Sequence, residues 1–229
     1  MKQRKLVVLT GAGMSAESGL KTFRDMGGLW EEYDVMEVAS IQGWERNPEL
    51  VLKFYNDRRK QLENAEPNMG HKALVDLEEN FDVTIITQNV DNLHERAGSK
   101  HVLHLHGVLT EVKSTGDPSL VYDIGYKDIH WGDSCEKGHQ LRPNIVWFGE
   151  PVPAIESAAY LSGQADIYAV IGTSLNVYPA AGLINYVPAD APVYLIDPND
   201  VMAPARRVEF IKAKAGAGVK KLAEILLNK

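Results

Sequence analysis

Residues 5–16, with the sequence KLVVLTGAGMSA, decide the fold of this chain. An apolar run from Leu6 to Leu9 leads directly into Gly11, Ala12 and Gly13. A short apolar strand followed by a glycine-rich turn is typical of a dinucleotide-binding βα unit, in which glycines let the backbone approach a pyrophosphate. Ala16 occupies the third glycine position, where a small side chain still permits close packing. Alone, this pattern also fits a tight strand-to-helix turn that binds nothing.

Five further apolar runs follow at intervals, each short and continuous. They are 82–87 (DVTIIT), 102–105 (VLHL), 166–172 (DIYAVIG), 192–196 (PVYLI) and 207–212 (RVEFIK). Continuous runs of this length are typical of strands that are covered on both faces. Helical spacing of apolar residues lies between them, at 48–63, from His71 to residue 79, and at 216–228. The alternation predicts an α/β fold with a Rossmann-like, doubly wound parallel sheet.

The stretch 110–145 differs from the rest of the chain. It is rich in glycine, contains two prolines and has weak periodicity. We therefore expect one domain over residues 1–229 with a small inserted lobe at about 110–145. Apolar side chains such as Ile129 and Trp131 are available to pack that lobe.

Charge and cysteine content exclude several classes of protein. The formal net charge is -7, which argues against a general nucleic-acid binder because such proteins need a basic surface. Cys135 is the single cysteine, so no disulfide can form within the chain, and a cytoplasmic location is expected. The first apolar run is too short for a secretion signal, and no run is long enough for a membrane-spanning helix.

A family resemblance rests on several segments in order along the chain. The first is residues 11–30 (GAGMSAESGLKTFRDMGGLW), and the others are 88–94 (QNVDNLH), 104–107 (HLHG), 142–150 (RPNIVWFGE), 172–174 (GTS) and 177–181 (VYPAA). Together they resemble the sirtuins, and residues 54–59 (FYNDRR) resemble the bacterial class III subgroup of that family, which removes succinyl and malonyl groups. The resemblance implies a protein-lysine deacylase that consumes NAD and releases nicotinamide and 2′-O-acyl-ADP-ribose. Acylated lysines of proteins are then the expected partners, and the protein is expected to be a monomer.

The implied chemistry needs a general base with a pKa near neutrality, for which histidine is suited. His106, directly before Gly107, matches the family's base. His104 lies two residues earlier and would share a face with it in an extended strand, so spacing alone does not choose between them. Asn89 and Asp91 match the residues that orient the nicotinamide and the ribose, although Asn and Asp also favour turns after a strand.

The resemblance also assigns a set of NAD-binding residues. Phe23 is expected to shield the reactive ribose from water, and Arg24 to contact phosphate or ribose oxygens. Thr173 follows a strand of the predicted parallel sheet, where ligands bind in such folds. The full set is Gly11, Ala12, Gly13, Ser15, Ala16, Glu17, Phe23, Arg24, Trp30, Gln88, Asn89, Val90, Asp91, Gly172, Thr173, Ser174, Asp197 and Ala215.

Tyr55 and Arg58 lie three residues apart on the predicted helix 48–63 and so share a face. A hydroxyl and a guanidinium together would bind a carboxylate at the end of an acyl chain, and the resemblance assigns them that role. An isolated pair of this kind would also fit a tyrosine at the core edge beside a solvated arginine. The peptide is expected to lie between two extended segments, with contacts from Val146, Phe148, Gly149, Asn176 and Val177.

Most sirtuins hold zinc in the inserted lobe with two Cys-x-x-Cys pairs, and this chain departs from that pattern. Cys135, His139, His130 and Asp133 could supply mixed ligands, but one thiolate in such a set would be unusual. We therefore expect no structural zinc and no other metal.

Three other functions fit parts of the sequence. An ADP-ribosyltransferase or NAD hydrolase could use the same scaffold, and so could a catalytically silent sensor of NAD or ADP-ribose. The Tyr55 and Arg58 pair argues against the first, and His106 argues against the second. A hydride-transferring dehydrogenase fits worst, because Glu31 and Glu32 do not end a second strand as the ribose-binding acid should.

Overall fold

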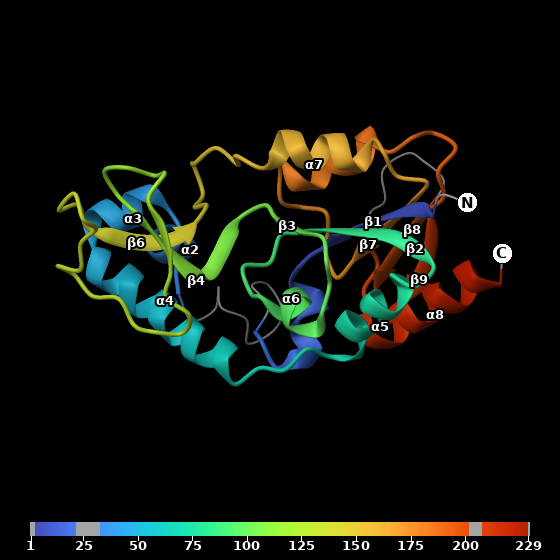
Figure 1. The fold of residues 1–229 in the computed structure, drawn as a ribbon, viewed down its shortest axis with the longest axis horizontal. Coiled ribbons are helices and arrows are strands. Elements are labelled where there is room, and N and C mark those ends of the chain that lie inside the picture. Colours follow the sequence, from blue (N-terminus) through green and yellow to red (C-terminus); the bar gives the residue numbers. More distant parts are fainter. Residues whose placement is uncertain (1–2, 22–32, 202–207, 229) are drawn as a thin grey trace.

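A computed structural model describes residues 3–21, 33–201 and 208–228 of the chain. Its larger part is a six-stranded parallel sheet (Figure 1). The strands are β1 (Arg4–Thr10), β2 (Phe81–Thr87), β3 (Val102–His104), β7 (Ile167–Ile171), β8 (Val193–Asp197) and β9 (Glu209–Lys212), in the order β3-β2-β1-β7-β8-β9. This confirms the predicted α/β fold with a doubly wound parallel sheet. None of the described helices is long and apolar enough to cross a bilayer.

Helices cover both faces of this sheet, as the continuous apolar runs predict. Leu6 and Val8 of β1 face α5 (Met69–Leu77) and α8 (Ala215–Leu227). Val7 and Leu9 face α7 (Ile155–Ser162) and the 3-10 helix η3 (Ala180–Tyr186). Figure 1 shows α7 on one side of the sheet and α5 with α8 on the other. The short helix α6 (Leu93–Ala97) follows β2.

The second lobe is an antiparallel sheet of β4 (Gly107–Ser114), β5 (Val121–Asp123) and β6 (Leu141–Ile145). Three helices from an earlier part of the chain pack against it: α2 (Val35–Val38), α3 (Ile41–Arg46) and α4 (Pro48–Glu63). Figure 1 shows this lobe beside the large sheet. The lobe therefore draws on two separate stretches of sequence, whereas 110–145 alone was expected to form it. Its own hydrophobic cluster, with Trp44, Leu52, Phe54 and Val112 among its members, is distinct from the two clusters of the large sheet.

Polar side chains on α4 hold the loop between β5 and β6. Arg59 is fully buried and donates to the carbonyl oxygens of Lys127 (3.0 Å) and Leu109 (3.4 Å). Asn56 donates to the carbonyl oxygen of Ile129 and accepts from the N–H of the same residue. In the loop beyond, the thiol of Cys135 donates to Ser114 Oγ at 3.3 Å, and Trp131 is mostly exposed. Over the described part of the chain, no group of three or more His, Cys, Asp or Glu side chains could hold a metal ion.

Helix α5 begins two residues before the predicted His71, because Asn68 caps it. The Asn68 carboxamide accepts from the N–H of Gly70 and of His71, and His71 Nδ1 accepts from the N–H of Asn68. His71 is fully buried, and its ring meets that of the buried His94 edge to face, with centroids 4.8 Å apart. Burial lowers the pKa of His71 to about 4 and that of His94 well below its ordinary value. Both rings are therefore neutral in the folded protein at pH 7.

This pair predicts that the protein loses stability in mild acid. An unfolded histidine binds a proton as the pH falls through about 6.5, while folded His71 resists until about 4. Between these values the unfolded state holds more protons, so the free energy of unfolding should fall by up to about 1.4 kcal/mol per pH unit for each such histidine. Urea midpoints at pH 7 and pH 5 measure this. His71→Asn, which keeps an acceptor for the Asn68 N–H, should flatten the slope, and an unchanged slope would contradict the assignment.

Candidate active site

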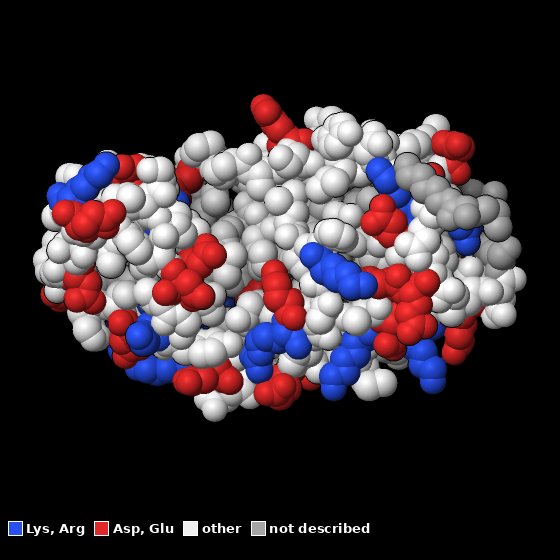
Figure 2. Space-filling model, in the orientation of Figure 1, with Lys and Arg blue, Asp and Glu red and all other residues white. Residues whose placement is uncertain are grey.

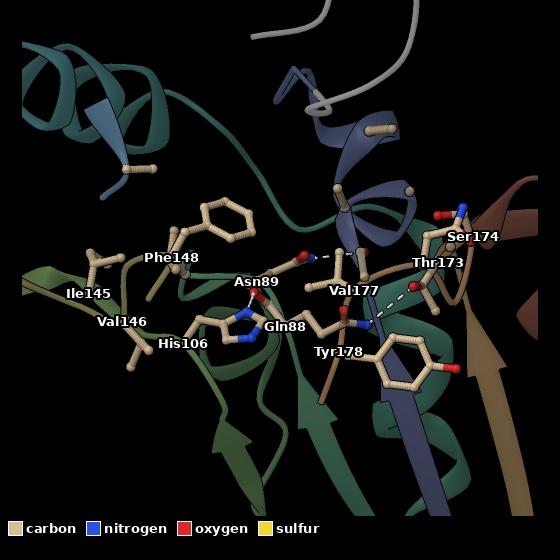
Figure 3. Close-up of a pocket in the computed structure, with 18 of the residues that line it drawn as sticks. Gln88, Asn89, His106, Ile145, Val146, Phe148, Thr173, Ser174, Val177 and Tyr178 are labelled. Carbon is tan, nitrogen blue, oxygen red and sulfur yellow. Dashed lines mark hydrogen bonds between the residues drawn. The ribbon is translucent and has the colours of Figure 1, made fainter. Parts of the chain in front are cut away.

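A cavity of about 680 Å³ lies where the carboxyl ends of β1, β2, β7 and β8 meet the small lobe. Figure 2 shows the face hollowed between the two lobes, with mostly uncharged atoms around the hollow. Figure 3 shows His106 near the centre of the cavity, with Phe148 and Val146 on one side and Thr173, Val177 and Tyr178 on the other. This position agrees with the rule that ligands of open α/β sheets bind beyond the carboxyl ends of the strands.

The glycine-rich turn after β1 packs directly on the turn after β7. The N–H of Gly11 donates to Ile171 O and that of Gly13 to Gly172 O, at 3.0 and 2.9 Å. A Cβ on Gly13 would lie 2.8 Å from Gly172 Cα, so this close approach explains the glycines. The turn leads into two 3-10 helices, η1 (Ala12–Met14) and η2 (Ala16–Ser18), and not into the expected α-helix within the residues described up to 21.

Gly172→Ala is expected to destabilise the protein by about 2 kcal/mol or more. Gly172 has φ +62°, and an added Cβ would meet the Met14 backbone and lie 2.8 Å from Gly13 Cα. The matched control is Gly163→Ala at the end of α7, where φ is -69° and the nearest atom would be 3.4 Å away. Urea unfolding of both variants tests this, and equal effects would contradict the argument.

Asn89, Ser15 and Asp91 form a buried hydrogen-bonded chain. Asn89 Nδ2 donates to Gly11 O and to Ser15 Oγ, and Ser15 Oγ donates to Asp91 Oδ2 at 2.9 Å. Asp91 Oδ1 accepts from the N–H of Leu93. Burial raises the pKa of Asp91, and these two hydrogen bonds oppose the shift. Ser15 and Asp91 line a recess of about 30 Å³ that shares Gln88, Asn89 and Val90 with the main cavity.

The structure distinguishes the two candidate histidines. His106 lies in a bend after β3 and lines the cavity, and its Nδ1 donates to the carbonyl oxygen of Gln88 at 3.0 Å. Because a carbonyl only accepts, the proton is on Nδ1 and the lone pair of the neutral ring is on Nε2. Burial lowers the pKa of His106, so the ring is neutral at pH 7. It can therefore accept a proton.

His104 is bound on both ring nitrogens. Nδ1 lies 3.0 Å from Asn89 O, and Nε2 lies 2.8 Å from Glu95 Oε1. Burial disfavours the charged ring, but the hydrogen bond and charge of Glu95 outweigh it and raise the pKa of His104. His104 does not line the cavity among the described residues. The two histidines do not lie on one regular strand, because the chain bends at residues 105 and 106.

The predicted NAD-binding residues mostly meet at the cavity. Gly172, Thr173 and Ser174 line it after β7, Asp197 lines it at the end of β8, and Ala16 lines it beside the first turn. Glu17 also lines it and accepts from the N–H of Gly216 at 2.8 Å. Ala215 does not line the cavity, because it begins α8 and is buried in the core cluster, and Lys214 lines the wall in its place. Phe23, Arg24 and Trp30 lie outside the described residues.

Tyr55 and Arg58 line the same cavity from α4, in the small lobe. Burial raises the pKa of Tyr55 to about 12, so its hydroxyl keeps its proton at pH 7. Val146, Phe148 and Gly149 line one side of the cavity, and Asn176 and Val177 line the other (Figure 3). Neither segment is a regular strand, although Phe148 bridges to Ser40.

Sequence reasoning missed several lining residues. They are Ala39, Val152, Pro198, Asn199, Asp200, Val201 and Lys214. The turn at 198–201 follows β8 directly, so the rule on strand ends could have identified it. Ala39 precedes a short helix of the small lobe and carries no such signal.

Fold and cavity together define an α/β protein with a cavity of dinucleotide size at the strand ends, beside a neutral histidine. Comparison with known proteins makes this specific. Residues 11–179 match the model of the Sir2 family. An NAD-dependent protein deacylase of Bacteroides thetaiotaomicron is 55% identical over 98% of both chains, and one of Helicobacter pylori is 57% identical over 86% of this chain and 83% of its own. The solved structure of a Sir2 homologue with NAD matches with a TM-score of 0.88 at 38% identity, covering 99% of this chain and 90% of that one.

The chain belongs to the Sir2 family, and it is an NAD-dependent enzyme. The cavity fits the dinucleotide in size, since pockets for ligands of this class span about 300–1,000 Å³. Its glycine turns have no side chains that would block a pyrophosphate, and hydroxyl and carboxylate groups stand at the ends of β7 and β8.

Proposed function

We propose that this enzyme preferentially removes acyl groups that end in a carboxylate, such as succinyl and malonyl, from lysines of proteins, and that it also removes acetyl. One observation carries the proposal: Tyr55 and Arg58 line the same cavity as His106. A protonated hydroxyl and a guanidinium on one helix face suit a carboxylate, because both donate hydrogen bonds to it.

The general activity, without regard to the acyl group, is NAD-dependent protein deacylation. It follows from family membership and from 55% identity over 98% of the chain to an NAD-dependent protein deacylase. The solved complex titled Sir2-p53 peptide-NAD+ matches with a TM-score of 0.80 at 30% identity, covering 99% of this chain and 95% of that one. NAD supplies the ribose carbon that accepts the acyl oxygen as nicotinamide leaves.

The chain's own residues then have separate tasks. Nε2 of His106 accepts the proton of a ribose hydroxyl, while the Gln88 carbonyl keeps the ring in the correct tautomer. Ser15 holds the Asn89 carboxamide and the Asp91 carboxylate in fixed positions, which supports an orienting role. Phe148 and Val177 border the entry from opposite sides, where they could hold the peptide.

The proposal is tested with one peptide carrying acetyl-, malonyl-, succinyl- or 4-methylpentanoyl-lysine. In the last group, an isopropyl end replaces the carboxylate of succinyl without a large change in size. Mass-spectrometric turnover with and without NAD should give the highest kcat/KM for the two acidic groups. A preference for 4-methylpentanoyl over succinyl would overturn the proposed selectivity for acidic acyl groups, while the deacylase activity itself would stand.

A further inference from the structure

The hydroxyl of Tyr55 is held by a tryptophan from another part of the chain. Trp147 Nε1 donates to Tyr55 Oη at 3.0 Å, although the residues are 92 positions apart. Both side chains are almost fully buried, and their ring centroids are 6.4 Å apart. The bond joins α4 to the segment after β6, and these are the elements that carry the small-lobe wall of the cavity.

This hydrogen bond restricts the direction of the phenol proton. The indole N–H only donates, so Tyr55 Oη is the acceptor and its own O–H must point elsewhere. Burial raises the pKa of Tyr55 to about 12, so the proton is present at pH 7. Arg58 lies on the same face of α4 and lines the same cavity. A tyrosine held in this way is set to donate to a group that Arg58 also binds.

Trp147 is in turn held on its ring and on its backbone. The Arg142 guanidinium carbon lies 3.4 Å from the centroid of the indole ring. The Arg142 guanidinium donates to both carboxylate oxygens of Glu150, from Nη1 to Oε1 at 2.7 Å and from Nη2 to Oε2 at 3.0 Å. Glu150 Oε2 also accepts from the N–H of Trp147 at 2.8 Å. These contacts leave the indole little freedom to turn away from Tyr55.

We propose that Trp147 is a positioning residue for acyl selectivity, which directs the Tyr55 hydroxyl proton toward the carboxylate of an acidic acyl group. The inference rests on the proposed function of Tyr55 and Arg58. It goes beyond that function because it makes selectivity depend on a residue that acts through Tyr55.

A double-mutant cycle with succinyl- and acetyl-lysine peptides tests this. Trp147→Phe removes the indole donor and keeps an aromatic ring. KM for the succinyl peptide should rise about three- to tenfold, the range for one lost hydrogen bond. The KM for the acetyl peptide should rise by a smaller factor, because acetyl has no carboxylate for the Tyr55 hydroxyl to meet. In a Tyr55→Phe background, Trp147→Phe should change the succinyl KM by less than about twofold, because no hydroxyl remains to be directed.

Two results would overturn the inference while the proposed function stands: an equal loss with both peptides, or the same succinyl KM change in the Tyr55→Phe background. If the wild type shows no preference for succinyl, the proposed function fails first and the inference fails with it. Should Trp147→Phe fold poorly, benzothienylalanine at position 147 replaces the N–H by sulfur at nearly the same volume. It should give the same succinyl-specific rise in KM.

Discussion

Replacing His106 by asparagine is expected to lower kcat for every acyl peptide by about 10²–10⁴-fold, the usual contribution of a general base. His106 lines the cavity, and its hydrogen bond to the Gln88 carbonyl leaves Nε2 as the free base. Asparagine can still donate to that carbonyl, but it has no basic nitrogen. The loss should therefore be chemical, with unfolding temperature and NAD binding close to those of the wild type.

The pH profile gives a second readout for His106. Since burial lowers its pKa, wild-type kcat/KM should rise with pH below about 6.5 and be flat above it. The residual activity of His106→Asn should lack this rise. His101→Asn is the matched control, because His101 is exposed and lies outside the cavity wall. If His106→Asn retained a tenth of wild-type kcat, the base would have to be another residue.

Replacing Arg58 by methionine is expected to lower kcat/KM for succinyl- and malonyl-lysine by about 10–150-fold, with acetyl-lysine within about threefold. The range corresponds to about 1.5–3 kcal/mol for hydrogen bonds to a charged group. Methionine fills similar volume and cannot bind a carboxylate. The variant should also prefer 4-methylpentanoyl-lysine to succinyl-lysine, which reverses the expected order of the wild type.

The control for Arg58 lies on the same helix. Lys53→Met also removes one positive charge from α4, but Lys53 is exposed, pairs with Asp57 and lies outside the cavity. It should leave all acyl peptides within about twofold. Equal losses on acetyl and succinyl peptides in Arg58→Met would mean that the variant disturbs the cavity as a whole. Unchanged selectivity between acidic and neutral acyl groups would mean that another residue binds the carboxylate.

The sequence predicts helix 48–63 with its observed bounds because the signals are local. Pro48 stands in the first turn, and the Asn47 side chain caps the helix by accepting from the N–H of Leu50. The continuous apolar runs likewise identify the strands of the large sheet, since burial on both faces leaves no alternation. The placement of the nucleotide site at the strand ends follows from that topology.

Features that depend on contacts between distant parts of the chain could not be predicted from local sequence signals. The bend that separates His106 from His104 occurs beside Gly107, which has φ +84° and packs so tightly on the Asn144 carbonyl that a Cβ would clash. The membership of α2 to α4 in the small lobe depends on packing against β4 and β6, far along the chain. The hydrogen bond from Trp147 to Tyr55 joins residues 92 apart, and neither local sequence indicates it.

The two lobes have separate hydrophobic clusters, and this has an evolutionary consequence. The groups that we assign to acyl selectivity stand on α4 and next to β6, while the histidine and most nucleotide-binding groups stand at strand ends of the large sheet or next to them. Substitutions in the small lobe can thus change which acyl group is removed without altering His106 or the nucleotide-binding residues. We expect descendants of this fold to diverge first in the small lobe, so that new acyl preferences arise while His106 and the nucleotide site stay unchanged.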